Sequence, residues 1–94
     1  MTIVWSPRAV GHLVALRQHI ADTNPAAATR IGGLIVEGVE RLARFPGLGR
    51  PGRIAGTREL VVPGTRYLVP YRVRGSRVEV IAVFHERQRW PKQL

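Results

Sequence analysis

The sequence predicts one α+β domain over residues 1–94, with the element order β-α-α-β-β-β and a helical hairpin packed on a small antiparallel sheet. Two observations carry this prediction. Apolar residues recur at helical spacing in the first half of the chain, whereas in the second half they alternate with polar residues as in strands. Glycine and proline separate the segments, and 94 residues suffice for a single two-layer core.

The first two elements are a strand and a helix. The β-rich run Thr2–Trp5 is followed by Ser6 and Pro7. Serine is a favoured N-cap and proline is favoured at the first helical position, so we expect a helix from Pro7 to about Thr23. Its apolar residues lie near one side of the helix: Val10, Leu13, Val14, Leu16 and Ile20.

The second helix begins by the same device, with Asn24 as the cap and Pro25 in the first turn, and it is expected over roughly Ala26–Phe45. It carries a clear apolar stripe: Ile31, Leu34, Ile35, Val39, Leu42 and Phe45. Glycine is unfavourable inside a helix, so its presence indicates a close approach of the first helix. Three glycines have this position: Gly32, Gly33 and Gly38.

The second half predicts three strands. Residues 46–52 contain three glycines and two prolines, which excludes regular structure there, and this loop can extend to Gly56. The strands are expected at Thr57–Val62, Arg66–Arg74 and Arg77–Phe84. Pro70 cannot donate to a strand ladder, so the middle strand should bulge or lie at an edge near this residue.

Side-chain alternation divides the middle strand into two faces. One face should carry Tyr67, Val69, Tyr71 and Val73, and the other Leu68, Pro70, Arg72 and Arg74. We expect Arg72 and Arg74 on the side of the sheet that the helices do not cover.

The net charge of +9 lies entirely in the second half of the chain. Residues 1–40 hold three basic and three acidic groups (3 − 3 = 0), and residues 41–94 hold twelve basic and three acidic groups (12 − 3 = +9). Fourteen of the fifteen basic residues are arginine, whose planar guanidinium suits phosphate and carboxylate. The asymmetry predicts an anionic partner, either nucleic acid or an acidic protein.

Several classes of protein are not favoured. Cysteine is absent, so no disulfide or thiolate metal site is expected, and no apolar run is long enough for a membrane span. The first residues do not resemble a signal peptide, so we expect a cytoplasmic protein. His12 and His19 lack a third ligand, and we expect neither a metal nor another cofactor.

Several segments, in this order, resemble the RelE/ParE superfamily of bacterial toxins from type II toxin–antitoxin operons. The segments, which span nearly the whole chain, are 4–7 (VWSP), 24–27 (NPAA), 40–52 (ERLARFPGLGRPG), 57–62 (TRELVV), 71–73 (YRV) and 83–91 (VFHERQRWP). The resemblance implies the same α+β fold and a partnership with a cognate acidic antitoxin.

Within this superfamily the chain resembles the ParE-like branch, which poisons DNA gyrase, more than the RelE-like branch, which cuts mRNA on the ribosome. Leu68 stands where RelE-like toxins carry an arginine, and the only lysine is Lys92. The C-terminal tyrosine of RelE-like toxins is missing, and Trp90 cannot transfer a proton. The segment from His85 to Pro91, with a basic run before Trp-Pro, resembles the ParE-like branch.

We therefore expect no catalytic residue and a partner-binding surface made of Arg58, Arg72, Arg74, Arg77, Arg87, Arg89 and Trp90, with Arg66 nearby. Trp90 is equally compatible with packing against the core. The alternative interpretation is a ribosome-dependent mRNA endoribonuclease that uses His85 as a base, with Arg58, Arg72 and Arg87 as possible phosphate-binding groups. A third interpretation, a simple nucleic-acid-binding module, fits less well because the two helices carry no net charge to read bases.

Overall fold

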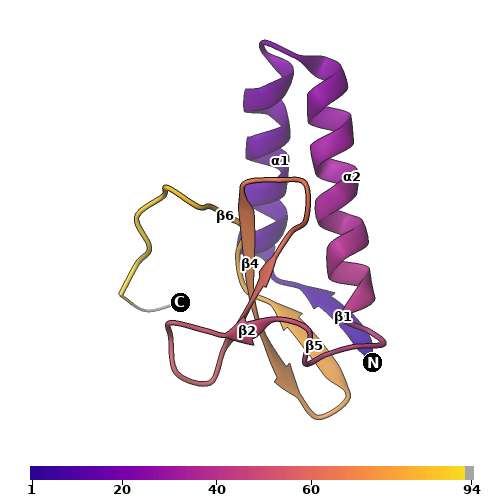
Figure 1. Cartoon of the computed structure of the whole chain (residues 1–94), viewed down its shortest axis with the longest axis vertical. Coiled ribbons are helices and arrows are strands. Elements are labelled where there is room, and N and C mark those ends of the chain that lie inside the picture. The colour runs from indigo at the N-terminus through magenta and orange to yellow at the C-terminus, as the bar shows by residue number, and fades with distance from the viewer. Residues whose placement is uncertain (93–94) are drawn as a thin grey trace.

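The structure is a computed structural model that describes residues 1–92. A hairpin of two helices lies over one face of a sheet, which confirms the predicted α+β fold (Figure 1). In chain order the elements are β1 (Thr2–Trp5), α1 (Pro7–Ala21), α2 (Pro25–Arg41), β2 (Arg50–Pro51), β3 (Arg58–Val61), β4 (Tyr67–Arg74), β5 (Arg77–Val80) and β6 (Phe84–His85).

Both predicted N-caps are confirmed. The Ser6 hydroxyl oxygen accepts a hydrogen bond from the Ala9 N–H at 3.0 Å, and the Asn24 side-chain oxygen accepts one from the Ala27 N–H at 3.0 Å. The Ser6 hydroxyl also donates to the Ile81 carbonyl at 2.9 Å. The start of α1 is therefore tied directly to the sheet.

Both helices are shorter than predicted. α2 ends at Arg41, because Leu42 and Ala43 donate to carbonyls three residues back, at 3.0 and 3.1 Å, and so tighten the last turn. Phe45 consequently lies beyond the helix and is 59% exposed, so its predicted place in the apolar stripe is wrong.

The apolar stripe of α1 is only partly buried. Leu13 and Leu16 pack against the core, but Val10 and Val14 are 46% and 48% exposed. The stripe therefore spans more of the helix circumference than the sheet and α2 cover.

The three glycines of α2 face different parts of the structure. A Cβ atom at Gly32 would lie 2.9 Å from the Arg17 side chain, so α1 and α2 do approach closely there, as predicted. Gly38 instead faces Leu60 and Val62, on the sheet side of α2. Gly33 has open space around it, so the predicted close approach is wrong at that position.

The sheet has the strand order β1-β5-β4-β3-β2, with β6 also paired to β4. Every pair is antiparallel except β1 with β5, which run parallel from Thr2↔Arg77 to Trp5↔Val80. The sheet predicted as antiparallel therefore has a parallel edge, which β1, the strand before the helical hairpin, forms with β5.

The disturbance predicted at Pro70 is confirmed, and it divides the third predicted strand into β5 and β6. The register changes from Tyr71↔Val80 to Leu68↔Phe84, so residues 69–70 of β4 lie opposite residues 81–83. The Pro70 carbonyl accepts a hydrogen bond from the Ile81 N–H at 2.9 Å, but proline has no N–H to return. The partner strand therefore bulges here.

Residues 46–52 were expected to be irregular throughout, but they include a short strand. Arg50 and Pro51 form β2, which pairs with Glu59 and Arg58 at the edge of the sheet. The Tyr71 hydroxyl fixes the start of this segment, since it accepts from the Gly49 N–H at 2.8 Å and donates to the Pro46 carbonyl at 2.7 Å.

Both faces of the middle of β4 are buried. Val69 and Tyr71 belong to the core that the helices cover, as alternation predicts. Leu68 and Pro70, on the opposite face, are also buried, and β6 places Phe84 directly beside Leu68. Arg72 and Arg74 lie on the face away from the helical core, where we expected them.

Within residues 1–92, neither helix has the length and apolar character needed to cross a membrane.

Candidate partner-binding surface

The hairpin that joins β4 to β5 carries three arginines, here called the basic face: Arg72, Arg74 and Arg77. Arg74 and Arg77 are register partners, and both contact the Glu79 carboxylate, at 3.4 and 3.6 Å. Arg72 lies opposite Glu79 in the same ladder. Three guanidiniums against one carboxylate leave this face with a charge of +2 (3 − 1), exposed for an anionic partner.

Arg58 and Arg72 line one shallow cleft of about 310 Å³ together with Pro51, Gly56, Thr57 and Val73. The Arg58 guanidinium donates to the Gly49 carbonyl at 2.8 Å and to the Gly47 carbonyl at 3.4 Å. Part of its donor capacity therefore holds the loop before β2, and Arg58 combines this structural contact with a place beside Arg72.

A buried carboxylate joins the loop around β2 to the sheet. Glu59 is 2% exposed and accepts from the Arg53 backbone N–H at 2.8 Å, the Arg53 Nε at 3.1 Å and the Arg50 guanidinium at 3.1 Å. Burial raises the pKa of Glu59, but these donors outweigh burial and hold the pKa below its usual 4.5. Glu59 therefore offsets part of the positive charge of Arg50 and Arg53, for which the sequence analysis predicted no partner.

Trp90 packs against the body of the protein. Its ring lies 4.8 Å from the Phe84 ring between centroids, and the Arg53 guanidinium carbon lies 3.7 Å from the Trp90 ring centre. Trp90 Nε1 is buried and has no hydrogen-bond partner in the described part of the chain. The indole is partly exposed, so it both anchors the tail and contributes to the surface.

His85 forms structural contacts on the opposite side of the tail. Its Nδ1 accepts from the Arg87 backbone N–H at 3.1 Å, and its ring meets Tyr67 edge-on at 5.3 Å. His85 pairs with Tyr67 and Arg58 pairs with Tyr71, four residues apart along β4, which corresponds to a separation of roughly 13 Å. The structure therefore does not bring His85 and Arg58 to one phosphate group.

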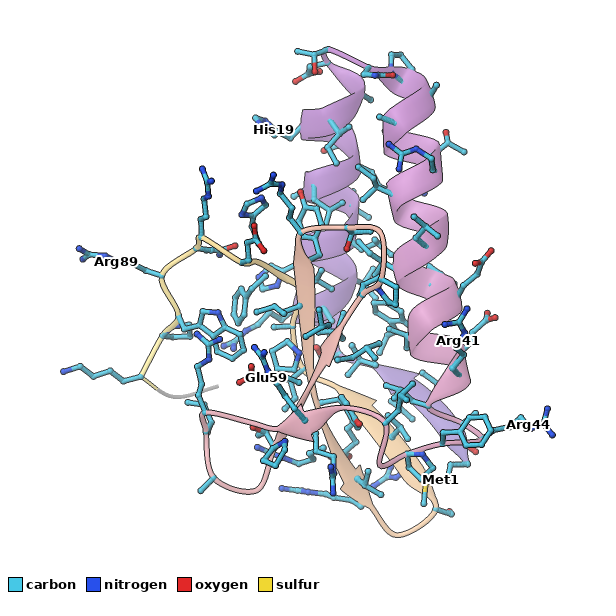
Figure 2. The ribbon with its side chains drawn as sticks, in the orientation of Figure 1. Met1, His19, Arg41, Arg44, Glu59 and Arg89 are labelled. Carbon is cyan, nitrogen blue, oxygen red and sulfur yellow. The ribbon has the colours of Figure 1, made fainter. Side chains whose placement is uncertain are left out.

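The tail after β6 carries exposed cations. Arg66 forms an exposed ion pair with Glu86 at 3.0 Å, which occupies both groups. Arg87 and Arg89 are exposed and form no ion pair among residues 1–92, and Arg89 points away from the body (Figure 2). These two guanidiniums are therefore available to meet a partner.

His12 of α1 makes a structural contact with the segment before β6. His12 Nδ1 accepts from the Val83 N–H at 3.1 Å, and burial, with the nearby charge of Arg8, lowers the pKa of His12 below 6.5. Across the described residues, no three His, Cys, Asp or Glu side chains are grouped as metal ligands. His12 therefore serves as a neutral acceptor for the bulged segment before β6.

Sequence reasoning missed the Glu59–Arg53–Trp90 connection. A signal was present, since Glu59 is an acidic residue inside an apolar strand and follows an arginine-rich loop. A carboxylate at such a position needs a cationic partner when buried. The partner's identity and the stacking of Trp90 depend on how the loop folds back.

Comparisons with known proteins identify the family of the chain. Residues 3–90 match the model of the family described as "ParE toxin of type II toxin-antitoxin system, parDE". The chain belongs to the ParE toxin family. The match spans both helices, the sheet and the tail to Trp90, so it includes the basic face and the exposed tail cations.

Curated relatives and solved structures cover nearly the same length. "Putative toxin Y4kP" of Sinorhizobium fredii is 41% identical over 98% of this chain and 95% of its own. "Toxin RelE2" of Caulobacter vibrioides is 34% identical over 88% of this chain and 92% of its own. A chain of the chromosomal ParDE toxin–antitoxin system of P. aeruginosa superposes with a TM-score of 0.82 at 27% identity, over 90% of this chain and 95% of that one.

Proposed function

We propose that this ParE-family toxin is neutralised by an acidic antitoxin and, when free, inhibits DNA gyrase without catalysing a reaction itself. The match of residues 3–90 to the ParE toxin model carries the proposal. The TM-score of 0.82 with a chain of a ParDE system supports the same branch of the superfamily.

Two observations support the antitoxin part of the proposal: the net charge of the chain and its similarity to solved structures of toxin–antitoxin systems. A second structure, the RelBE2 toxin–antitoxin complex of Mycobacterium tuberculosis, has a TM-score of 0.65 at 27% identity over 89% of this chain and 95% of that one. A protein of net charge +9 attracts an acidic chain over a long range and so captures it quickly.

The gyrase part is supported by the arrangement of the side chains that RNA cleavage would need. His85 Nδ1 is already bonded to the Arg87 N–H, Arg58 is bonded to loop carbonyls, and the two residues pair with β4 positions that are four residues apart. A general base, a general acid and phosphate-binding cations must share one site to cleave RNA. The exposed Arg87 and Arg89 instead suit contact with a DNA-bound enzyme.

Ribosome-dependent mRNA cleavage is the second candidate, because curated relatives include toxins named RelE2 and RelE1. In that case His85 would act through Nε2, the ring nitrogen that the Arg87 N–H does not occupy. Arg58 and Arg87 would have to move toward it when substrate binds.

Induced expression in cells separates the two candidates. Gyrase inhibition should relax a resident plasmid and leave transcripts intact, and co-expression of the cognate antitoxin should restore both growth and supercoiling. Fragmented transcripts with normal supercoiling, abolished by His85→Ala, would establish the endoribonuclease instead. Failure of the antitoxin to restore growth would reject the partnership.

A further inference from the structure

A cleft of about 300 Å³ lies between α1 and the segment around β6, and all three histidines of the chain line it. The α1 side consists of four residues whose spacing of three and four places them on one face of the helix: His12, Ala15, Leu16 and His19. The other side consists of Tyr67 of β4 and three residues in and around β6: Val83, His85 and Gln88. The fold therefore gathers imidazoles that are distant in the sequence.

The backbone already uses the acceptor atoms of three of these side chains. His12 Nδ1 accepts from the Val83 N–H at 3.1 Å, and His85 Nδ1 accepts from the Arg87 N–H at 3.1 Å. A neutral imidazole carries one proton, so both rings carry it on Nε2 and offer an N–H donor there. The Gln88 Oε1 accepts from the His85 N–H at 3.3 Å, which leaves the Gln88 amide N–H groups for a ligand.

Tyr67 and His19 add to these donors. The Tyr67 ring meets the His85 ring edge-on, with 5.3 Å between centroids. Burial raises the pKa of Tyr67, so its hydroxyl stays protonated at neutral pH and can donate. His19 is exposed at the rim of the cleft and projects from α1 on the side of the tail (Figure 2). The polar groups of the cleft therefore suit a ligand that accepts hydrogen bonds.

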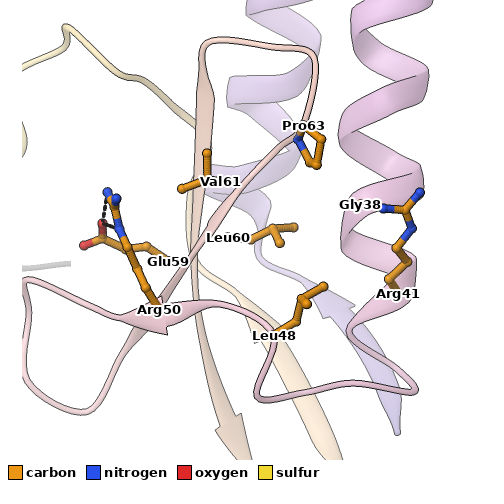
Figure 3. A pocket seen from close by; sticks show the side chains of 8 residues that line it. All are labelled: Gly38, Arg41, Leu48, Arg50, Glu59, Leu60, Val61 and Pro63. Carbon is orange, nitrogen blue, oxygen red and sulfur yellow. Dashed lines mark hydrogen bonds and ion pairs between the residues drawn. The ribbon is translucent and has the colours of Figure 1, made fainter.

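The charges around the cleft favour an anion. Among residues 1–92, no aspartate or glutamate lines it. The pocket between α2 and β3 differs in this respect, since it contains the Glu59 carboxylate bonded to Arg50 (Figure 3). The charge of Arg8 acts on His12 at one end of the histidine cleft. Donors without a competing carboxylate, on a chain of net charge +9, attract anionic oxygen atoms.

The rest of the lining is apolar and indicates that the anion has an organic body. Leu16 packs against the core, Val83 is buried, and Ala15 forms the helix side between the two histidines. Pockets of roughly 300 to 1,000 Å³ with apolar walls and a few placed polar groups hold small organic ligands. The cleft lies at the lower end of this range. An inorganic ion alone would leave the apolar lining uncovered.

We propose that this cleft binds a small organic anion, whose carboxylate or phosphate group accepts hydrogen bonds from His12, His85 and Gln88 and whose apolar body covers Leu16 and Val83. The inference is independent of the proposed function, since it assigns neither the antitoxin nor gyrase to the cleft. The ligand would lie where β6 leads into the tail.

The histidines themselves provide the measurement, because each imidazole gives its own Cε1–H signal in an NMR spectrum of the full chain. Benzoate is the probe, at neutral pH and constant ionic strength. Benzamide keeps the ring and removes the charge, formate keeps the carboxylate and removes the ring, and phenyl phosphate replaces the carboxylate by phosphate. Ala15→Phe fills the cleft from α1, and Ala26→Phe places the same ring at an exposed position of α2 away from the cleft.

We expect benzoate to shift the His12 and His85 signals saturably, with a dissociation constant of about 1 mM for a ligand of this size. Benzamide and formate should each bind at least about tenfold more weakly, because one lacks the charge and the other the apolar body. Ala15→Phe should weaken benzoate binding by about tenfold or more, and Ala26→Phe should bind within about twofold of the wild type. Tighter binding of phenyl phosphate than of benzoate would identify a phosphate ester as the preferred ligand.

Four results would overturn the inference. Benzoate at about 50 mM, well above the expected dissociation constant, that leaves all three histidine signals unmoved would exclude the site. Benzamide that binds as tightly as benzoate would exclude recognition of an anion, and formate that does so would exclude the organic body. Equal effects of Ala15→Phe and Ala26→Phe would place binding outside the cleft. The ligand series uses the wild-type chain, so it decides the matter even if circular dichroism shows that Ala15→Phe alters the fold.

Discussion

The guanidinium carbon of Arg53 lies 3.7 Å from the centre of the Trp90 ring, and the same side chain donates to the buried Glu59 carboxylate at 3.1 Å. One arginine therefore joins the loop after β2, strand β3 and the C-terminal tail. The tail that carries Arg87 and Arg89 is positioned through this contact and through the packing of Trp90 on Phe84.

Trp90→Ala should lower the free energy of unfolding by about 2 kcal/mol, because it removes a partly buried aromatic ring and a cation–π contact. Urea denaturation measures the change. Arg53→Lys should reproduce a smaller part of it, since lysine keeps the charge and loses the planar group. If Trp90→Ala has wild-type stability, the tail is not held by this packing.

Glu59→Gln should destabilise the fold by about 2 kcal/mol, because the buried side chain loses its charge-assisted hydrogen bonds with two arginines. The folded-state pKa of Glu59 lies below 4.5, so its stabilisation is present above pH 4.5 and is lost as the pH falls below that value. Wild-type stability should therefore decline below pH 4.5, and the variant should decline less steeply. Parallel acid limbs in the two proteins would show that another group is responsible.

Protonation of His12 should destabilise the fold at mildly acidic pH. Its folded-state pKa lies below 6.5, so the unfolded chain takes up a proton first and stability falls as the pH drops below 6.5. His12→Asn keeps an acceptor for the Val83 N–H and removes the titration, so this slope should flatten. His19→Asn, at an exposed position on the same helix, is the control; an equal effect there would contradict the role of His12.

Two glycine-to-alanine substitutions should have opposite effects. Gly33→Ala, with open space around it inside α2, should stabilise by up to about 1 kcal/mol. At Gly49 a Cβ would lie 2.6 Å from the Tyr71 ring, so Gly49→Ala should destabilise by about 2 kcal/mol or more through overpacking. Thermal unfolding of both variants measures the difference, and equal shifts would argue against the tight contact at Gly49.

Arg87→Ala combined with Arg89→Ala should reduce gyrase inhibition by about tenfold while leaving affinity for the antitoxin nearly unchanged. The two guanidiniums are exposed and contribute little to the fold. Arg8→Ala combined with Arg30→Ala, at exposed positions of the two helices, removes the same two charges and controls for the loss of charge alone. Inhibition that survives the double substitution would place the target contact elsewhere, with the basic face the next surface to test.

Apolar periodicity, capping residues, glycine and proline predict the helices and strands well, because each helix or strand depends mainly on residues that are neighbours in the chain. Ser6 and Asn24 cap their helices as expected, and the missing N–H of Pro70 correctly predicts a break in the ladder. Local signals do not predict which strands pair with one another. The parallel pairing of β1 with β5, and the pairing of Arg50 with Glu59 that forms β2, depend on residues distant in the chain.

The arrangement of the residues proposed for the candidate surface was predicted only in part. Alternation correctly places Arg72 and Arg74 on one face, since this depends only on the strand period. It does not reveal that Glu79 bridges Arg74 and Arg77, that Glu86 pairs with Arg66, or that Arg58 is held by loop carbonyls. Those contacts follow from register and loop closure, which a single sequence does not specify.

The most direct test of the central claim is a reaction of purified toxin with purified DNA gyrase on relaxed plasmid, scored for supercoiling and, after detergent and protease, for linear DNA. We expect supercoiling to be lost, linear DNA to accumulate, and prior addition of the antitoxin to prevent both. Normal supercoiling without linear DNA, at toxin concentrations above those that arrest growth, would contradict gyrase as the target.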